Sequence, residues 1–132
     1  MTAERSLLVT GAAAGIGAEI ARAAADSGYR VGVLDVDEAG AQATASRLDD
    51  AVALAASVAV EEQVEAALDT FGTPAVLVNN AGIVRFGPLL AQPAADFRAV
   101  VDVNLVGTFL CGRAAARRMA AAGVGGSSTW RP

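Results

Sequence analysis

Short apolar runs alternate along the chain with longer segments in which apolar residues recur at helical spacing. The apolar runs span residues 6–10, 30–35, 52–55 and 75–78, and the longer segments span residues 15–27, 37–48 and 61–71. Glycine, proline, asparagine or aspartate separates most of them, as expected where strands and helices end. This alternation of strand and helix is typical of an α/β domain in which helices cover both faces of a parallel sheet.

A last and longer segment, residues 93–122, predicts one long helix that is bent near its middle and ends at Gly123. Four large apolar side chains recur along it at intervals of four positions: Phe97, Val101, Leu105 and Phe109. Because residues four positions apart lie on one face of a helix, this row predicts a buried face.

The composition fits a single domain. The chain has 132 residues, of which 54% are hydrophobic, and this is enough for one core. The net charge is −4, and the ten arginines are scattered apart from one adjacent pair, so a nucleic-acid partner is not expected. Cys111 is the only cysteine, which excludes an internal disulfide and a cysteine-based metal cluster, and no metal site is predicted.

The N-terminal segment and the alanine-rich stretch bear on localisation. Residues 1–10 carry Glu4 and run directly into a glycine turn, which favours a first strand over a signal peptide. Residues 51–60 are rich in alanine but too few to span a bilayer. A single cysteine is compatible with a reducing compartment. We therefore expect a soluble, cytoplasmic protein with no membrane contact.

The first apolar run leads directly into a glycine-rich turn, Thr10-Gly11-Ala12-Ala13-Ala14-Gly15-Ile16-Gly17. Glycines allow a tight turn, and they let backbone N–H groups and the helix N-terminus approach a pyrophosphate that a Cβ atom would hold off. Thr10, Gly11, Ala13, Ala14, Gly15, Ile16 and Gly17 are therefore candidate nucleotide-binding residues. An ordinary glycine turn is the alternative, because a short glycine motif alone is weak evidence.

Asp35 gives the glycine turn a second, independent signal. It lies 18 residues after Gly17, at the end of the second predicted strand. A carboxylate there can accept hydrogen bonds from the adenosine ribose hydroxyls and would repel a 2′-phosphate, which favours NAD over NADP. The alternative is that Asp35 is a turn or cap residue, but Asp37 is better placed to cap the following helix.

A third motif, Asn79-Asn80-Ala81-Gly82, follows the fourth predicted strand. Taken with the glycine turn, it resembles the short-chain dehydrogenase/reductase family. The resemblance implies that Asn80, Ala81 and Gly82 contact the adenosine side of the cofactor. An asparagine-rich turn ending a strand is the alternative, but it leaves the glycine turn unexplained.

The segment 102–107 is similar to the part of this family that carries a catalytic asparagine on the long helix, and the residue at that position is Asn104. Asparagine is a mediocre helix former, so its place in a helix calls for a reason, although an asparagine on a solvated face is the alternative. One position departs from the family: Ser57 follows the third strand where an aspartate commonly binds the adenine amino group. A hydroxyl can accept that hydrogen bond more weakly, and the backbone at Val58 can still line the pocket.

The catalytic serine and the tyrosine and lysine of this family have no counterpart in the sequence. The chain contains no lysine, and Tyr29, its single tyrosine, is followed four residues later by Val33. The resemblance covers residues 5–124, about the first half of a family member, and residues 125–132 read as an unfamiliar tail without order. The hypothesis is a truncated product.

The resemblance implies a Rossmann-type doubly wound parallel sheet, cut short at strand order 3-2-1-4, with a long C-terminal helix. The fourth strand would then be an exposed edge, and apolar surface would be exposed on the sheet and on the long helix. In this family that helix often contributes to a homodimer, so a homo-oligomer is one expectation.

Two functions remain open on this fold. The first is an NAD-dependent oxidoreductase that moves a hydride between nicotinamide and a small-molecule alcohol or carbonyl substrate. The second is a noncatalytic NAD-binding fragment, which better describes these 132 residues by themselves. A methyltransferase on a similar sheet is a third and weaker alternative, because the three motifs together disfavour it.

Overall fold

The structure is a computed structural model that describes residues 5–123. Within that range four strands form one parallel sheet in the order β3-β2-β1-β4. The strands are β1 (Ser6–Thr10), β2 (Arg30–Asp35), β3 (Ala51–Ala55) and β4 (Val76–Val78). This confirms the predicted parallel sheet and its strand order. The prediction for residues 125–132 lies outside the described residues.

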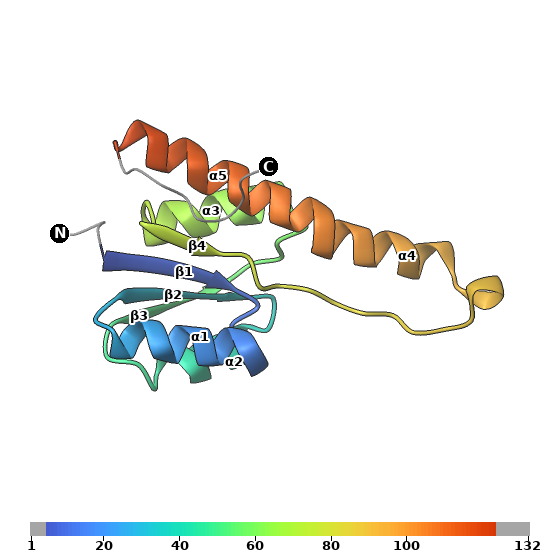
Figure 1. Cartoon of the computed structure of the whole chain (residues 1–132), viewed down its shortest axis with the longest axis horizontal. Helices are drawn as coiled ribbons and strands as arrows, with labels where there is room; N and C mark the ends of the chain where they lie inside the picture. The colour runs from blue at the N-terminus through green and yellow to red at the C-terminus, as the bar shows by residue number, and fades with distance from the viewer. Residues whose placement is uncertain (1–4, 124–132) are drawn as a thin grey trace.

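Helices cover both faces of the sheet (Figure 1). On one face lie α1 (Gly15–Asp26) and α2 (Glu38–Ala45), and on the other lie α3 (Glu61–Phe71) and α5 (Gly107–Ala121). The remaining elements are the 3₁₀ turn η2 (Leu89–Ala91), the helix α4 (Ala94–Val101) and the π-helical segment η3 (Asp102–Val106). The chain therefore has the doubly wound architecture that the alternating pattern predicts.

Alternate side chains of the strands enter two separate cores. Leu8 of β1 and Leu34 of β2 pack with α3 and α5, whereas Val9 and Val33 pack with α1 and α2. Successive side chains of a strand point to opposite faces, so a sheet covered on both sides has strands that are apolar throughout. All five residues of β1 are buried, as this arrangement requires.

The second helix shows why boundaries are harder to predict than elements. Asp37 caps α2, because its Oδ1 accepts a hydrogen bond from Gly40 N at 3.0 Å, as the sequence predicts. The helix ends at Ala45 rather than at residue 48. Backbone bonds with 3₁₀ spacing, from Arg47 N to Thr44 O and from Leu48 N to Ala45 O, replace the last helical turn.

The predicted buried row on the long helix is wrong. Phe97 is 65% exposed, Leu105 67% and Phe109 56%. The face that is buried is another one, made by Cys111, Ala114, Ala115 and Met119 of α5, which packs on α3 and the sheet. Periodicity reports which residues share a face, whereas burial depends on which face meets a partner.

Charged side chains fix α5 on α3. Arg118 forms ion pairs of 2.7 Å with both Glu65 and Asp69, and Arg113 forms one of 2.7 Å with Glu61. By contrast, α4 has no buried residue and extends beyond the edge of the sheet (Figure 1). The exposed apolar row therefore lies where no described element covers the helix.

The helix Ala94–Ala121 is also long and apolar enough to cross a membrane, judged by length and composition alone. Core helices of globular domains pass the same test, and the C-terminal half of this helix docks through its arginines and small side chains on α3. The N-terminal part of the helix, α4, has no buried residue, so the docking concerns the C-terminal half alone.

Candidate functional site

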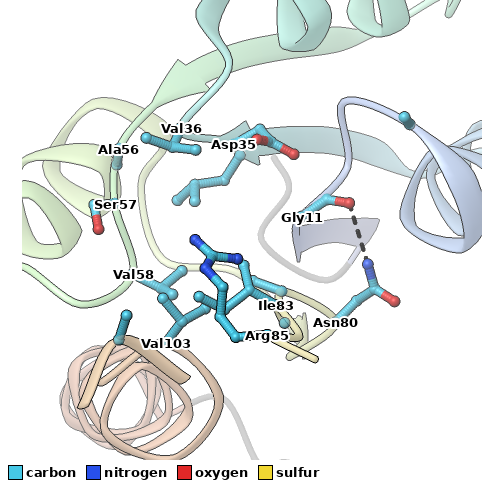
Figure 2. A pocket seen from close by; sticks show the side chains of 15 residues that line it. Gly11, Asp35, Val36, Ala56, Ser57, Val58, Asn80, Ile83, Arg85 and Val103 are labelled. Carbon is cyan, nitrogen blue, oxygen red and sulfur yellow. Dashed lines mark hydrogen bonds between the residues drawn. The ribbon is translucent and has the colours of Figure 1, made fainter. Parts of the chain in front are cut away.

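A pocket of about 490 Å³ lies at the carboxyl ends of the strands. In open parallel sheets this edge, where the connections leave in opposite directions, is where ligands bind. The pocket is lined by Gly11 and Ala14 after β1, residues 34–36 at the end of β2, residues 56–58 after β3, residues 80–83 and Arg85 after β4, and Ala99 and Val103 of the long helix. Figure 2 shows these segments converging on one hollow.

Eight of the predicted site residues line this pocket: Gly11, Ala14, Asp35, Ser57, Val58, Asn80, Ala81 and Gly82. Four others, Thr10, Ala13, Gly17 and Asn104, lie behind the wall and hold it through hydrogen bonds or close packing. The last two, Gly15 and Ile16, border a second hollow beside α1. The structure thus brings together segments that are far apart in the sequence, while the ligand contacts themselves stay predictions.

Thr10 joins the glycine turn to the asparagine motif. Its buried Oγ1 accepts hydrogen bonds from Asn80 N at 3.1 Å and from Ala81 N at 3.0 Å. In return, Asn80 Nδ2 donates to Gly11 O at 3.1 Å, which is the dashed line in Figure 2. The side chain of Asn80 therefore acts on the backbone of the glycine turn, and its main chain forms part of the pocket wall.

Two positions of the turn require glycine, because a Cβ atom at either one would clash with neighbouring atoms. Gly11 has φ +67, and a Cβ there would lie 2.8 Å from Ala81 Cα. A Cβ on Gly17 would overlap Gly11 O and lie 2.5 Å from Asn80 Nδ2. These distances are below those that carbon atoms tolerate, so the close approach of turn, helix and asparagine motif needs glycine at both positions.

Asp35 is anchored by two backbone donors. Its Oδ2 accepts from Ala13 N and its Oδ1 accepts from Asp37 N, each at 3.0 Å. The carboxylate therefore ties the end of β2 to the glycine turn and still has lone pairs on both oxygens for further donors at the pocket. Since Asp37 caps α2, Asp35 is not the cap, while the bond that Asp35 accepts from Asp37 N, two residues later, is a turn contact of the kind that the alternative expected.

Ser57 has local partners. Its N donates to Gln63 Oε1 at 2.7 Å, and its Oγ accepts from Ala59 N at 3.3 Å. The hydroxyl is thus partly used within the turn after β3, and its contact with adenine stays a prediction. Val58 is buried and packs against Gly107, where a Cβ would lie 3.0 Å from Val58 Cβ. The turn therefore abuts the long helix directly.

Asn104 lies in the π-helical segment, and its amide faces the loop after the asparagine motif. Oδ1 accepts from Ile83 N at 2.8 Å, and Nδ2 donates to Ile83 O at 2.9 Å. This gives the physical reason for an asparagine in the helix, since one amide pairs with both backbone groups of a residue that has no sheet partner. A catalytic role for Asn104 stays a prediction, and the contacts give it a positioning role.

Arg85 is the charged residue among those pocket residues that the motifs do not include. It lies three residues after Gly82, in an otherwise apolar stretch of loop, and Figure 2 shows its side chain extending toward the middle of the pocket. In the sequence, the one sign of its role is that a charged residue interrupts an apolar stretch. Elsewhere in residues 5–123, no group of three or more His, Cys, Asp or Glu side chains could hold a metal ion.

Comparison with known proteins agrees with this geometry. Residues 5–127 match a family model described as short chain dehydrogenase. The chain belongs to the short-chain dehydrogenase family. It is 38% identical over 126 residues to a D-threitol dehydrogenase of Mycolicibacterium smegmatis, a match that covers 89% of this chain and 48% of the relative. It is 43% identical to a cis-4-hydroxycyclohexanecarboxylate dehydrogenase of Sinomonas cyclohexanicum, with 93% of this chain and 53% of the relative covered.

A solved short-chain dehydrogenase relative has the same fold. The structure of a 3-oxoacyl-[acyl-carrier protein] reductase from Brucella melitensis with bound NAD superposes with a TM-score of 0.87 at 36% identity. That match covers 94% of this chain and 52% of the reductase. The chain therefore spans about half the length of the short-chain dehydrogenases that it matches.

Proposed function

We propose that the chain is the cofactor-binding half of an NAD-dependent short-chain dehydrogenase. In the proposed reaction, nicotinamide accepts or delivers a hydride, and the substrate is the alcohol or carbonyl carbon of a small molecule. Membership of the family supports the oxidoreductase class. The residues present fit the adenosine and phosphate portions of a dinucleotide, because the glycine turn, the Asp35 carboxylate and the asparagine motif line one pocket.

The observation that carries the choice of NAD is the place of Asp35. Its carboxylate lines the pocket at the end of β2 and is held against the glycine turn through Ala13 N. A carboxylate in this position accepts hydrogen bonds from both ribose hydroxyls and repels a phosphate on the 2′-oxygen. The NAD bound to the Brucella melitensis reductase supports a dinucleotide without deciding between the two cofactors.

The second candidate function is a noncatalytic NAD-binding chain. It is favoured by the position of Tyr29, which precedes β2 and so lies at the opposite end of the strand from the pocket. The Arg5 guanidinium carbon lies over the Tyr29 ring, 5.2 Å from the ring centroid. Tyr29 is therefore not placed to exchange a proton with a substrate. Turnover of an alcohol panel with NAD separates the two candidates, and binding without turnover supports the second.

Calorimetric titration of the 132-residue chain with NAD and NADP tests the proposal. We expect saturable binding that prefers NAD and is abolished in Asp35→Ala. Asp35→Asn keeps an acceptor oxygen but removes the charge, so the preference for NAD should fall roughly tenfold as the repulsion of the 2′-phosphate is lost. Asp49→Asn, an exposed site outside the pocket, is the matched control. A folded wild-type chain that binds neither dinucleotide would refute the proposal.

A further inference from the structure

The pocket has two charged side chains of opposite sign. Asp35 lies at the end of β2, and Arg85 enters from the loop after β4. The other lining residues are apolar or uncharged, and Leu34, Val58 and Val103 form much of the wall. A cation beside low-polarity walls interacts more strongly with an anion than a cation on the open surface does.

Arg85 is one of several arginines without an ion pair, and among these it is the one that lines the pocket. Arg22, Arg113 and Arg118 form ion pairs with carboxylates, and Arg30 stacks on Phe71 with its guanidinium 4.2 Å from the ring centroid. Within residues 5–123 the Arg85 guanidinium forms no ion pair, and its hydrogen bond goes to the adjacent Val84 O at 3.1 Å. Most of its five N–H donors therefore have no protein acceptor, and the exposed side chain extends toward the middle of the pocket.

We propose that Arg85 binds a phosphoryl group of the dinucleotide, opposite the glycine turn. The inference rests on the proposed function and deepens it. Gly11 and Ala14 place the turn on the wall that approaches the phosphates, and Arg85 enters the same pocket from the wall formed after β4. Guanidinium binds phosphate oxygens through two parallel N–H donors, which suits an arginine better than a lysine here.

The phosphoryl group has two sources, the pyrophosphate and a 2′-phosphate. Gly11 and Ala14 of the glycine turn line the same pocket as Arg85, which favours the pyrophosphate, and the Asp35 carboxylate disfavours the 2′-phosphate. Adenosine, ADP and 2′-AMP separate the sources, because they share the base and ribose and differ in the number and place of their phosphates. NMR titration measures the weak affinities of such fragments.

The variants are Arg85→Gln and Arg85→Lys, and Arg98→Gln is the control because Arg98 is exposed on α4 and outside the pocket. We expect Arg85→Gln to weaken ADP roughly tenfold to a hundredfold, as loss of a charge-assisted hydrogen bond predicts, and to leave adenosine unchanged. Arg85→Lys should keep part of the affinity. The loss should also shrink at high salt.

The outcomes are distinct. A selective loss with ADP supports the pyrophosphate, and a selective loss with 2′-AMP supports the 2′-phosphate as the bound group. Unchanged affinity for both phosphates in Arg85→Gln, or an equal loss with adenosine, overturns the inference while wild-type NAD binding leaves the proposed function intact. A wild-type chain that binds no nucleotide overturns both.

Discussion

The amide of Asn104 pairs with both backbone groups of Ile83, 21 residues earlier, at 2.8 Å and 2.9 Å. A backbone pairing of this kind usually comes from a neighbouring strand, and here one side chain on the long helix supplies it. Ile83 lines the pocket, so the helix fixes part of the pocket wall through Asn104.

Asn104→Ala should lower both the stability and the affinity for NAD. Each lost hydrogen bond is worth about 0.5–1.5 kcal/mol, and exposure of the site places the total near the low end, about 1 kcal/mol. Urea unfolding measures the stability and calorimetry measures the affinity. Asn104→Asp keeps the acceptor but sets a carboxylate oxygen against Ile83 O in place of Nδ2, so it should be at least as harmful as Asn104→Ala. Equal affinity in all three proteins would refute the positioning role.

Gly17→Ala and Gly15→Ala form a matched pair in the glycine turn. A Cβ on Gly17 would overlap backbone, so this change should cost about 3 kcal/mol of unfolding free energy and abolish nucleotide binding. Gly15 has φ +59 with no atom within 4 Å of a Cβ, so only backbone strain of about 1–2 kcal/mol applies. Thermal or urea unfolding checks the order, and equal losses would contradict the contact argument.

The Cys111 thiol should be unreactive in the folded chain. It is 2% exposed, and burial raises its pKa from 9.0 to about 12. A thiol-specific disulfide reagent at pH 8 should label it only in denaturant. Because the unfolded thiol loses its proton at lower pH than the folded one, stability should fall as pH rises from about 9 to 12.

Cys111→Ala provides the control for this pH dependence. The difference in unfolding free energy between the two proteins should be constant below pH 9 and should shrink above it. A constant difference up to pH 12 would show that the thiol does not titrate differently in the folded and unfolded states.

The exposed row on the long helix predicts self-association. Leu105 and Phe109 are more than half exposed on one helical face, and apolar surface of this kind promotes contact between chains. Leu105→Ser with Phe109→Ser should lower the apparent mass in sedimentation equilibrium. Phe86→Ser removes an equally large exposed ring from the loop, and a similar decrease in that variant would mean that the helix is not the contact.

The sequence predicted the parts of this molecule that depend on local pattern. Apolar runs and turn residues predicted the strands and the cap at Asp37, and motif spacing predicted the place of Asp35, whereas the strand order followed from the resemblance to the family. The contact between Asn104 and Ile83 could not be predicted, because it depends on how the loop between them folds. Arg85 was missed for the same reason.

The burial of the long helix shows another limit. The row that includes Phe97 and Phe109 has helical spacing, yet the buried face is the one with Cys111 and Ala115. Small residues there let α5 approach α3 closely, while Arg118 pairs with acidic residues on the neighbour. Which of the two apolar faces is buried depends on the position of α3, and the apolar pattern of the long helix does not contain that information.

Among the described elements, the helix α4 lacks packing partners and yet is continuous with the helix segment that lines the pocket. None of its residues is buried, whereas α5 is anchored on the core, so backbone amides of α4 should exchange hydrogen with solvent much faster than those of α5. Ala99 and Val103 nevertheless line the pocket. A nucleotide that contacts them adds contacts that this stretch otherwise lacks, and its binding should therefore slow hydrogen exchange along α4.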